Sequence, residues 1–214
     1  MQVYYRRTSE YFPALSFYKS AKKWCKEAQL VNNKIEVGEP GRLCLIYAAF
    51  TLESFISEEL WNRLPEPEYN RLFNNRVRFS IRHKWTQGCD FLSTPENSSQ
   101  EGLSIISNEC SDKGGYGLLV RSRNKLIHPK YHKEVFENDK HEILDRSLNT
   151  LITDLKDAHN FPQYIDSFPD IIISADAALW YHNIVQNMIR SFYLSINEPL
   201  QESWVQEFES DVLS

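Results

Sequence analysis

The chain contains little glycine and few segments in which valine, isoleucine or threonine alternate with polar residues. Only seven of its 214 residues are glycine, whereas sandwiches and barrels need turn residues between many short alternating strands. Hydrophobic residues make up 42% of the chain, which is enough for a packed core. Length and composition therefore indicate one mainly α-helical domain with an appendage, and exclude a disordered chain.

Long apolar runs and closely spaced cysteines are also missing. No run approaches the roughly 20 residues that a membrane-spanning helix needs, and the first residues, MQVYYRRTSEYF, lack the apolar core of a signal peptide. We therefore expect a cytoplasmic protein with no membrane partner. Cys25, Cys44, Cys89 and Cys110 form no CxxC pair, so the sequence suggests reduced, structural cysteines rather than a zinc site or a disulfide scaffold.

Acidic residues are absent from two stretches of a chain whose net charge is −5. The net charge is unfavourable for a nucleic-acid partner, but residues 71–84 and 121–133 contain only basic and neutral side chains, and the acids gather at 198–211. Aromatic residues are interleaved with the cations of the first stretch, as in many RNA-binding surfaces. The alternative for that stretch is a solvated helix face.

Apolar residues recur with a period near 3.6 along most of the chain, which predicts helices. The segment 41–64 is apolar around most of its circumference, begins after Gly41 and stops before Pro65, so it should be the central helix. The predicted helices comprise residues 14–32, 41–64, 68–92 as one or two pieces, 116–128, 140–158 and 176–196.

The remaining segments are expected to be irregular or peripheral. Residues 93–117 read as a loop with one helical turn, and the DIIIS sequence within 160–175 reads as an isolated extended piece. Leu200, Trp204, Phe208 and Val212 form a stripe that packs on its own chain or on a partner. We expect residues 1–158 to form the bundle, and residues 159–214 to form a C-terminal helical extension packed on the same domain.

The motif R-N-x-x-x-H ends the helix predicted at 116–128. With twelve arginines, six histidines and fifteen asparagines in the chain, chance gives about 0.02 occurrences of this pattern. Asn124 and His128 lie one turn apart on one face, so the amide can fix the imidazole tautomer, and Arg121 lies within about 20° of His128. A base for the ribose 2′-OH proton and a cation for the phosphate charge suit phosphodiester cleavage without a metal or other cofactor.

Arg123 falls instead on the apolar arc of the same helix, and Glu53 occupies the corresponding arc of the central helix. Isolated buried charges are costly, so the two side chains should form a direct ion pair. The pair is either purely structural, or Glu53 holds Arg123 at a cleft where its long stem reaches phosphate.

Other interpretations of the motif remain open. Cations at a helix C-terminus interact favourably with the helix dipole and need have no further role. His128 and His132 have the spacing of a helical metal site, but Pro129 lies between them and no third ligand is near, so we expect no metal. Lys84 contacts phosphate or is simply solvated.

Three features together resemble the HEPN superfamily of small helical bundles. They are RNKLIHPK at 123–130, IYAAFTLESFISEEL at 46–60, and RHKWTQGCDFL at 82–92. The first resembles the R-x(4 to 6)-H motif of the ribonuclease members, which often have Asn after the Arg. The resemblance covers roughly residues 14–158 and implies a HEPN-like up-and-down helical bundle with additional C-terminal helices.

The resemblance also implies a metal-independent endoribonuclease of toxin or phage-defence type. Arg123, Asn124 and His128 would be catalytic, with Glu53 in support, and two copies of the motif would face each other across a homodimer. Arg121, Lys84 and Lys130 would bind RNA, and an antitoxin or other defence-system protein is a possible partner. The alternative is a non-catalytic HEPN-like module that binds RNA, a nucleotide or a protein. The sequence does not indicate the RNA target.

Overall fold

The computed structural model describes residues 13–31, 38–73, 81–93, 98–127, 134–137, 140–143, 146–158 and 170–210. These residues are nearly all helical, which confirms the predicted all-α class, and none of their helices is both long and apolar enough to cross a membrane. The elements are α1 (Pro13–Leu30), α2 (Glu39–Arg63), α3 (Glu66–Phe73), α4 (Ile81–Leu92), α5 (Gln100–Glu109), α6 (Gly115–Ile127), β1 (Glu134–Glu137), β2 (Lys140–Ile143), α7 (Arg146–Ala158), α8 (Asp170–Ile173), α9 (Ala175–Ser195) and α10 (Glu202–Glu209).

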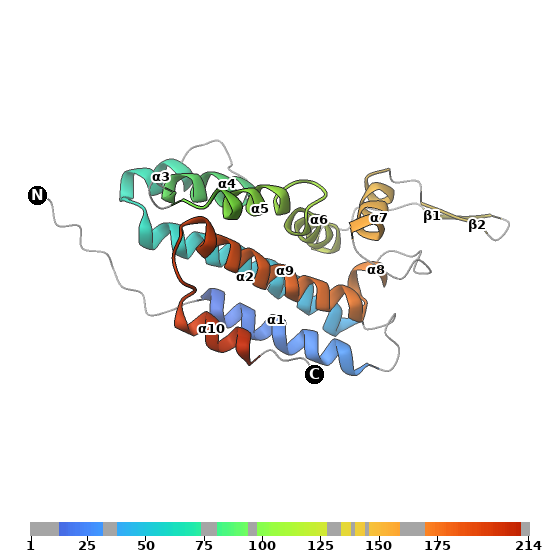
Figure 1. Ribbon diagram of the computed structural model, residues 1–214. Helices are drawn as coiled ribbons and strands as arrows, with labels where there is room; N and C mark the ends of the chain where they lie inside the picture. The colour runs from blue at the N-terminus through green and yellow to red at the C-terminus, as the bar shows by residue number, and fades with distance from the viewer. Residues whose placement is uncertain are drawn as a thin grey trace, which may run out of the picture.

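Helices α2 and α9 form the centre of the bundle and run parallel to each other (Figure 1). Near their first turns the thiol of Cys44 donates to the carbonyl of Ala178 at 3.4 Å. Near their last turns the hydroxyl of Tyr193 donates to Glu59 at 2.9 Å. The predicted central helix 41–64 is thus confirmed to within two residues at each end, because its apolar surface is covered on several sides.

Helices α1 and α10 lie on one side of this central pair, and α3 to α6 lie on the other (Figure 1). Phe55 of α2 connects the central pair to the second side: its ring stacks on Trp85 of α4 at 5.8 Å and meets Phe192 of α9 edge-on at 5.2 Å. All three rings are almost fully buried. One continuous core therefore runs from α9 through α2 to α4.

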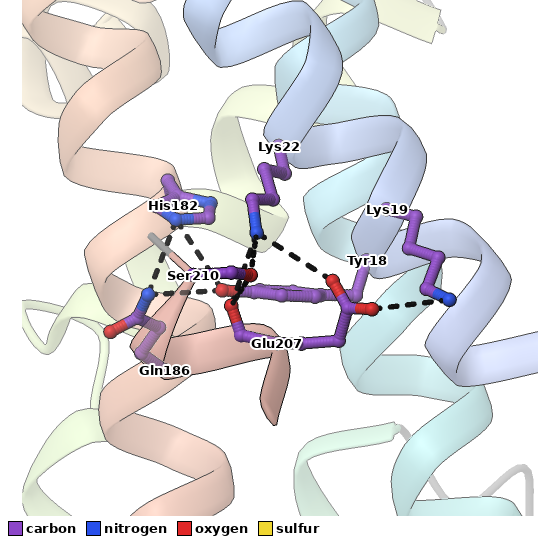
Figure 2. A network of polar contacts seen from close by, with 7 residues as sticks. All are labelled: Tyr18, Lys19, Lys22, His182, Gln186, Glu207 and Ser210. Atoms are coloured by element: carbon purple, nitrogen blue, oxygen red, sulfur yellow. Dashed lines mark hydrogen bonds and ion pairs between the residues drawn. The ribbon is translucent and has the colours of Figure 1, made fainter. Parts of the chain in front are cut away.

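Helix α10 packs on α1 through two aromatic side chains. Tyr18 is buried between Trp204 and Phe208, with ring centroids 5.5 and 5.3 Å away. Lys22 caps the last turn of α10 by donating to the carbonyl of Glu207 at 3.1 Å (Figure 2). Trp204 and Phe208 confirm that the tail stripe packs on its own chain, whereas Val212 lies outside the described residues.

The expected loop at 93–117 is wrong, because ten of its residues form α5. Ser99 caps this helix by accepting from the backbone N–H of Gly102 at 3.3 Å. Gly102 itself packs against the end of α9, where a Cβ atom would lie 2.5 Å from the backbone nitrogen of Ser195. Gly102 thus contacts α9 through its backbone, and because it has no side chain the apolar periodicity of α5 is weak.

Two further expectations need correction. The helix predicted over 140–158 begins only at Arg146, because residues 140–143 pair with 134–137 as an antiparallel hairpin in which Glu137 lies opposite Lys140. The DIIIS segment is not extended but forms the short helix α8, whose three isoleucines are buried. A short apolar run has the same appearance in a buried strand and in a buried helical turn, so periodicity could not decide between them.

Residues 170–210 pack extensively on the rest of the bundle. Helix α9 contacts α1, α2, α5, α6 and α8, and most of its residues are buried. It caps its own start through Ser174, whose hydroxyl accepts from the N–H of Ala177 at 3.1 Å. The bundle is therefore completed by the C-terminal part of the chain.

Candidate functional site

The predicted pair between Arg123 and Glu53 is present where α6 meets α2. The guanidinium of Arg123 donates through Nη2 to Oε1 of Glu53, and the two side chains are 17% and 26% exposed. Helical periodicity explains this contact, because Glu53 lies on the face of α2 that packs against α6 and Arg123 lies on the face of α6 that packs against α2. The contact confirms the prediction that each supplies the counter-charge of the other, because partly buried charges need partners.

Aromatic residues of α6 and α4 form the inner wall beside this ion pair. Tyr116 lies two turns before Arg123 on α6, is almost fully buried, and its ring lies 6.0 Å from that of Trp85. Burial raises the pKa of Tyr116 well above its usual value, and the charge of Glu53 raises it further while Arg123 opposes the shift. The phenol thus stays neutral, and water is excluded from the core side of the pair.

Lys84 of α4 brings a second cation to the same carboxylate. Its Nζ lies 3.5 Å from the hydroxyl of Ser57, which follows Glu53 by one turn on α2. Burial lowers the pKa of Lys84, and the carboxylate of Glu53 opposes that shift. Arg123 and Lys84 therefore both interact with the carboxylate of Glu53. The cluster of Glu53, Arg123 and Lys84 has an excess of one positive charge.

Arg123 also retains hydrogen-bonding capacity. Its Nε–H is buried and has no hydrogen-bond partner within the described part of the chain. A guanidinium carries five N–H donors in a fixed plane, which suits two-point contact with phosphate or carboxylate. The Nη groups lie on a side chain that is 17% exposed, so the donors that Glu53 does not use can reach a ligand.

Arg121 faces a different neighbour from Arg123. Its Nη1 lies 2.7 Å from Oδ2 of Asp154 on α7 and also donates to the carbonyl of Asp112 at 2.9 Å. Asp154 is almost fully buried and also receives Lys113 at 3.6 Å. These contacts give Arg121 a structural role in holding α7 on α6, and the predicted RNA contact at this residue stays a prediction.

The described residues contain only part of the R-N-x-x-x-H motif. Asn124 is exposed on the last turn of α6, where its side chain is accessible to a ligand. His128 and Lys130 lie outside the described residues, so the predicted pairing of the amide with the imidazole stays a prediction. The structure thus brings together Glu53, Arg123 and Lys84, whereas Arg121 binds Asp154 on α7.

Tyr116 and Ser57 lie beside the cluster of Glu53, Arg123 and Lys84 and were not predicted from the sequence. Each follows the helical period of a predicted residue, since Ser57 is four positions after Glu53 and Tyr116 is seven positions before Arg123. Polar groups at those spacings on an otherwise apolar face are a usable signal. The proximity of Lys84 to Glu53 depends on the packing of α4 on α2, for which the sequence offers no comparable signal.

The described residues include no group of three or more His, Cys, Asp or Glu side chains that could hold a metal ion. The four cysteines are buried and free. Burial raises the pKa of Cys110 to about 12 and raises that of Cys89 as well. Because the thiolate is the reactive form, these two cysteines are unsuited to act as nucleophiles in the folded protein.

The chain matches no protein-family model, no curated protein sequence and no solved structure.

Proposed function

We propose that the protein is a metal-independent endoribonuclease of toxin or phage-defence type, in which the segment from Arg123 to His128 forms the catalytic motif. The observation that carries the proposal is the cluster of Glu53, Arg123 and Lys84, which has an excess of one positive charge and whose Arg123 lies on α6, five residues before His128 in the sequence. Phosphodiester cleavage requires such a cationic group close to a titratable base.

In this proposal Glu53 positions Arg123 and the remaining guanidinium donors bind the scissile phosphate. The remaining Nη–H donors of Arg123, whose side chain is partly exposed, and the ammonium of Lys84 stabilise the charge that develops on the phosphate oxygens. His128 removes the proton of the ribose 2′-OH, and its conjugate acid protonates the leaving 5′ oxygen. Asn124 orients the imidazole, and the products are a cyclic phosphate and a 5′ hydroxyl.

Two copies of the motif at a homodimer interface would complete the site, as the resemblance to HEPN ribonucleases implies. The exposed last turn of α6 fits this arrangement, since Asn124 is exposed and the side chain of Ile127 is 39% exposed beside it. Light scattering of the purified protein should therefore give the mass of a dimer.

The decisive experiment compares RNA cleavage by the wild type with cleavage by three variants in EDTA. His128→Ala and Arg123→Ala should each reduce cleavage of a labelled single-stranded RNA by at least a hundredfold. Arg42→Ala is the matched control, because Arg42 is exposed near the start of α2 and lies outside the cluster and outside both basic stretches. The products should carry cyclic phosphate ends.

A non-catalytic HEPN-like module is the second candidate, and one observation favours it. Arg121 and Arg123 both bind carboxylates of their own chain, as basic residues do when their role is structural. If neither the wild type nor His128→Ala cleaves RNA at high protein concentration, while the wild type still retains RNA on a filter, the binding module replaces the enzyme. Growth arrest on expression that Arg123→Ala relieves would instead support the enzyme.

A further inference from the structure

A cavity on the far side of α2 from the Arg123 cluster has no role in the proposed function. It has a volume of about 130 Å³ and lies between the first turn of α1, the last turns of α2 and the start of α10. Its apolar walls are Leu15, Phe55 and Trp204, and Glu58, Asn62 and Gln201 contribute its polar groups. Such a mixture of apolar walls with a few converging polar groups is typical of small-ligand sites.

Glu58 is the carboxylate of this cavity that lacks a counter-charge. One of its oxygens accepts the backbone N–H of Ala14 at 3.0 Å, and no ion pair to it occurs among the residues that the structure describes. Its pKa is raised to about 7, mainly by burial and also by the neighbouring charge of Glu59, while the hydrogen bond from the Ala14 N–H opposes the shift. The ionised form is therefore destabilised for lack of a cation.

Glu59, by contrast, is already satisfied. Its Oε2 receives the guanidinium of Arg63 at 2.6 Å, and its Oε1 accepts the hydroxyl of Tyr193 at 2.9 Å and the amide of Gln201 at 3.4 Å. An additional cation in the cavity would have little to gain from this second carboxylate. Recognition of charge in the cavity thus depends on Glu58 alone.

The aromatic walls define the rest of the ligand. Trp204 and Phe55 meet edge to face with ring centroids 5.6 Å apart, and Leu15 adds an aliphatic surface. Aromatic and aliphatic walls favour a carbon chain, and a cation close to an aromatic ring gains further attraction. An anionic ligand would instead meet two carboxylates.

We propose that this cavity binds the ammonium group of a small organic amine, with Glu58 as the counter-ion and Phe55 and Trp204 packed on its carbon chain. The volume sets the size of the ligand. A cavity of about 150 Å³ holds benzene, so a volume of about 130 Å³ accommodates an alkylammonium ion of about five non-hydrogen atoms. The same chemistry occurs in free alkylamines and in the lysine side chain of a partner protein.

The experiment follows the indole N–H signal of Trp204 by NMR while n-butylammonium, butan-1-ol or butyrate is added to the full chain at pH 8 and fixed ionic strength. n-Butylammonium should bind at least tenfold more tightly than the alcohol of the same shape, and butyrate should not bind. Glu58→Gln should remove that tenfold preference and keep the shape of the cavity. Glu27→Gln, at an exposed position of α1, is the matched control and should retain it.

Lowering the pH is a second measurement that needs no variant. Alkylammonium ions stay protonated below pH 9, so affinity should fall about tenfold per pH unit below the pKa of Glu58. A tripeptide amide with a central lysine separates the two sources, since it binds if the natural ligand is a protein side chain and fails if only a free amine fits. Equal binding of the alcohol and the ammonium ion, an unchanged Trp204 signal, or wild-type affinity in Glu58→Gln would refute the proposal.

Discussion

The ion pair between Glu53 and Arg123 allows a prediction about stability that does not depend on catalysis. Both side chains are partly buried, so the pair lies between surface pairs, which contribute at most about 1 kcal/mol, and buried pairs, whose disruption costs about 3–5 kcal/mol. We expect Glu53→Gln to lower the free energy of unfolding by about 2–3 kcal/mol. Arg123→Met, which keeps most of the aliphatic stem, should cost about 1–2 kcal/mol.

The difference between the two variants follows from Lys84. When Arg123 is replaced, Glu53 retains a cation, because Lys84 lies close enough for the two charges to interact. When Glu53 is replaced, Arg123 and Lys84 face each other without any carboxylate of the cluster between them. A partly buried group that loses its only counter-charge is more destabilising than one that keeps a second partner.

Urea denaturation at pH 7 followed by circular dichroism measures both effects, and the double variant completes a thermodynamic cycle. The coupling energy between the two positions should be about 1–2 kcal/mol. Arg82→Met, which removes the exposed pair with Asp112, is the control and should change stability by less than about 1 kcal/mol. A coupling energy within about 0.3 kcal/mol of zero, or a larger loss in Arg123→Met than in Glu53→Gln, would refute this reasoning.

Three further predictions concern other parts of the bundle. The fold raises the pKa of Glu58 from 4.5 to about 7. Protonated Glu58 therefore adds to the free energy of unfolding, and this contribution is fully present below pH 4.5 and is lost as pH rises through 7. Because the side chain is only half-buried, we discount the full shift to about 1 kcal/mol, and Glu58→Gln should be stabilised by that amount at pH 8 in urea titrations. Gly102→Ala should destabilise the protein by about 1–3 kcal/mol, since the new Cβ would meet the backbone of Ser195, and thermal unfolding reports the loss. Trp204→Ala should remove about 3 kcal/mol of packing and increase hydrogen exchange of the α10 amides selectively.

The central part of the fold could be predicted because its sequence signals agree with one another. Helix α2 combines an apolar circumference with a proline in its first turn and another just beyond its end, so both its burial and its bounds follow from the sequence. The sequence signals of helix α5 do not agree in this way. Its close approach to α9 occurs at Gly102, and a residue without a side chain leaves no mark in a hydrophobic pattern.

The same contrast applies to the site. The contact between Glu53 and Arg123 could be predicted because each is a charged residue on the apolar arc of its helix. A buried charge needs a counter-charge, and few oppositely charged residues lie on such arcs. Asp154 has the same signature within the Leu151 and Leu155 stripe of α7, and this signal could have identified it as the partner of Arg121. The place of Lys84 could not be predicted, because it depends on how α4 packs across α2.

The two arginines of α6 show how one helix can be fixed from opposite sides. Positions 121 and 123 differ by about 200° around a helix, so Arg121 reaches Asp154 on α7 while Arg123 reaches Glu53 on α2. Lys125 adds a contact from its Nζ to the hydroxyl of Ser147 on α7 at 2.6 Å. The last turn of α6, which leads into the rest of the motif, is thus held between two neighbouring helices. Acid and base catalysis requires groups held to within a fraction of an ångström, and rigid elements achieve this better than loops. On this argument the ion pair of Arg121 with Asp154 contributes to the proposed reaction, because it fixes the helix that carries Arg123.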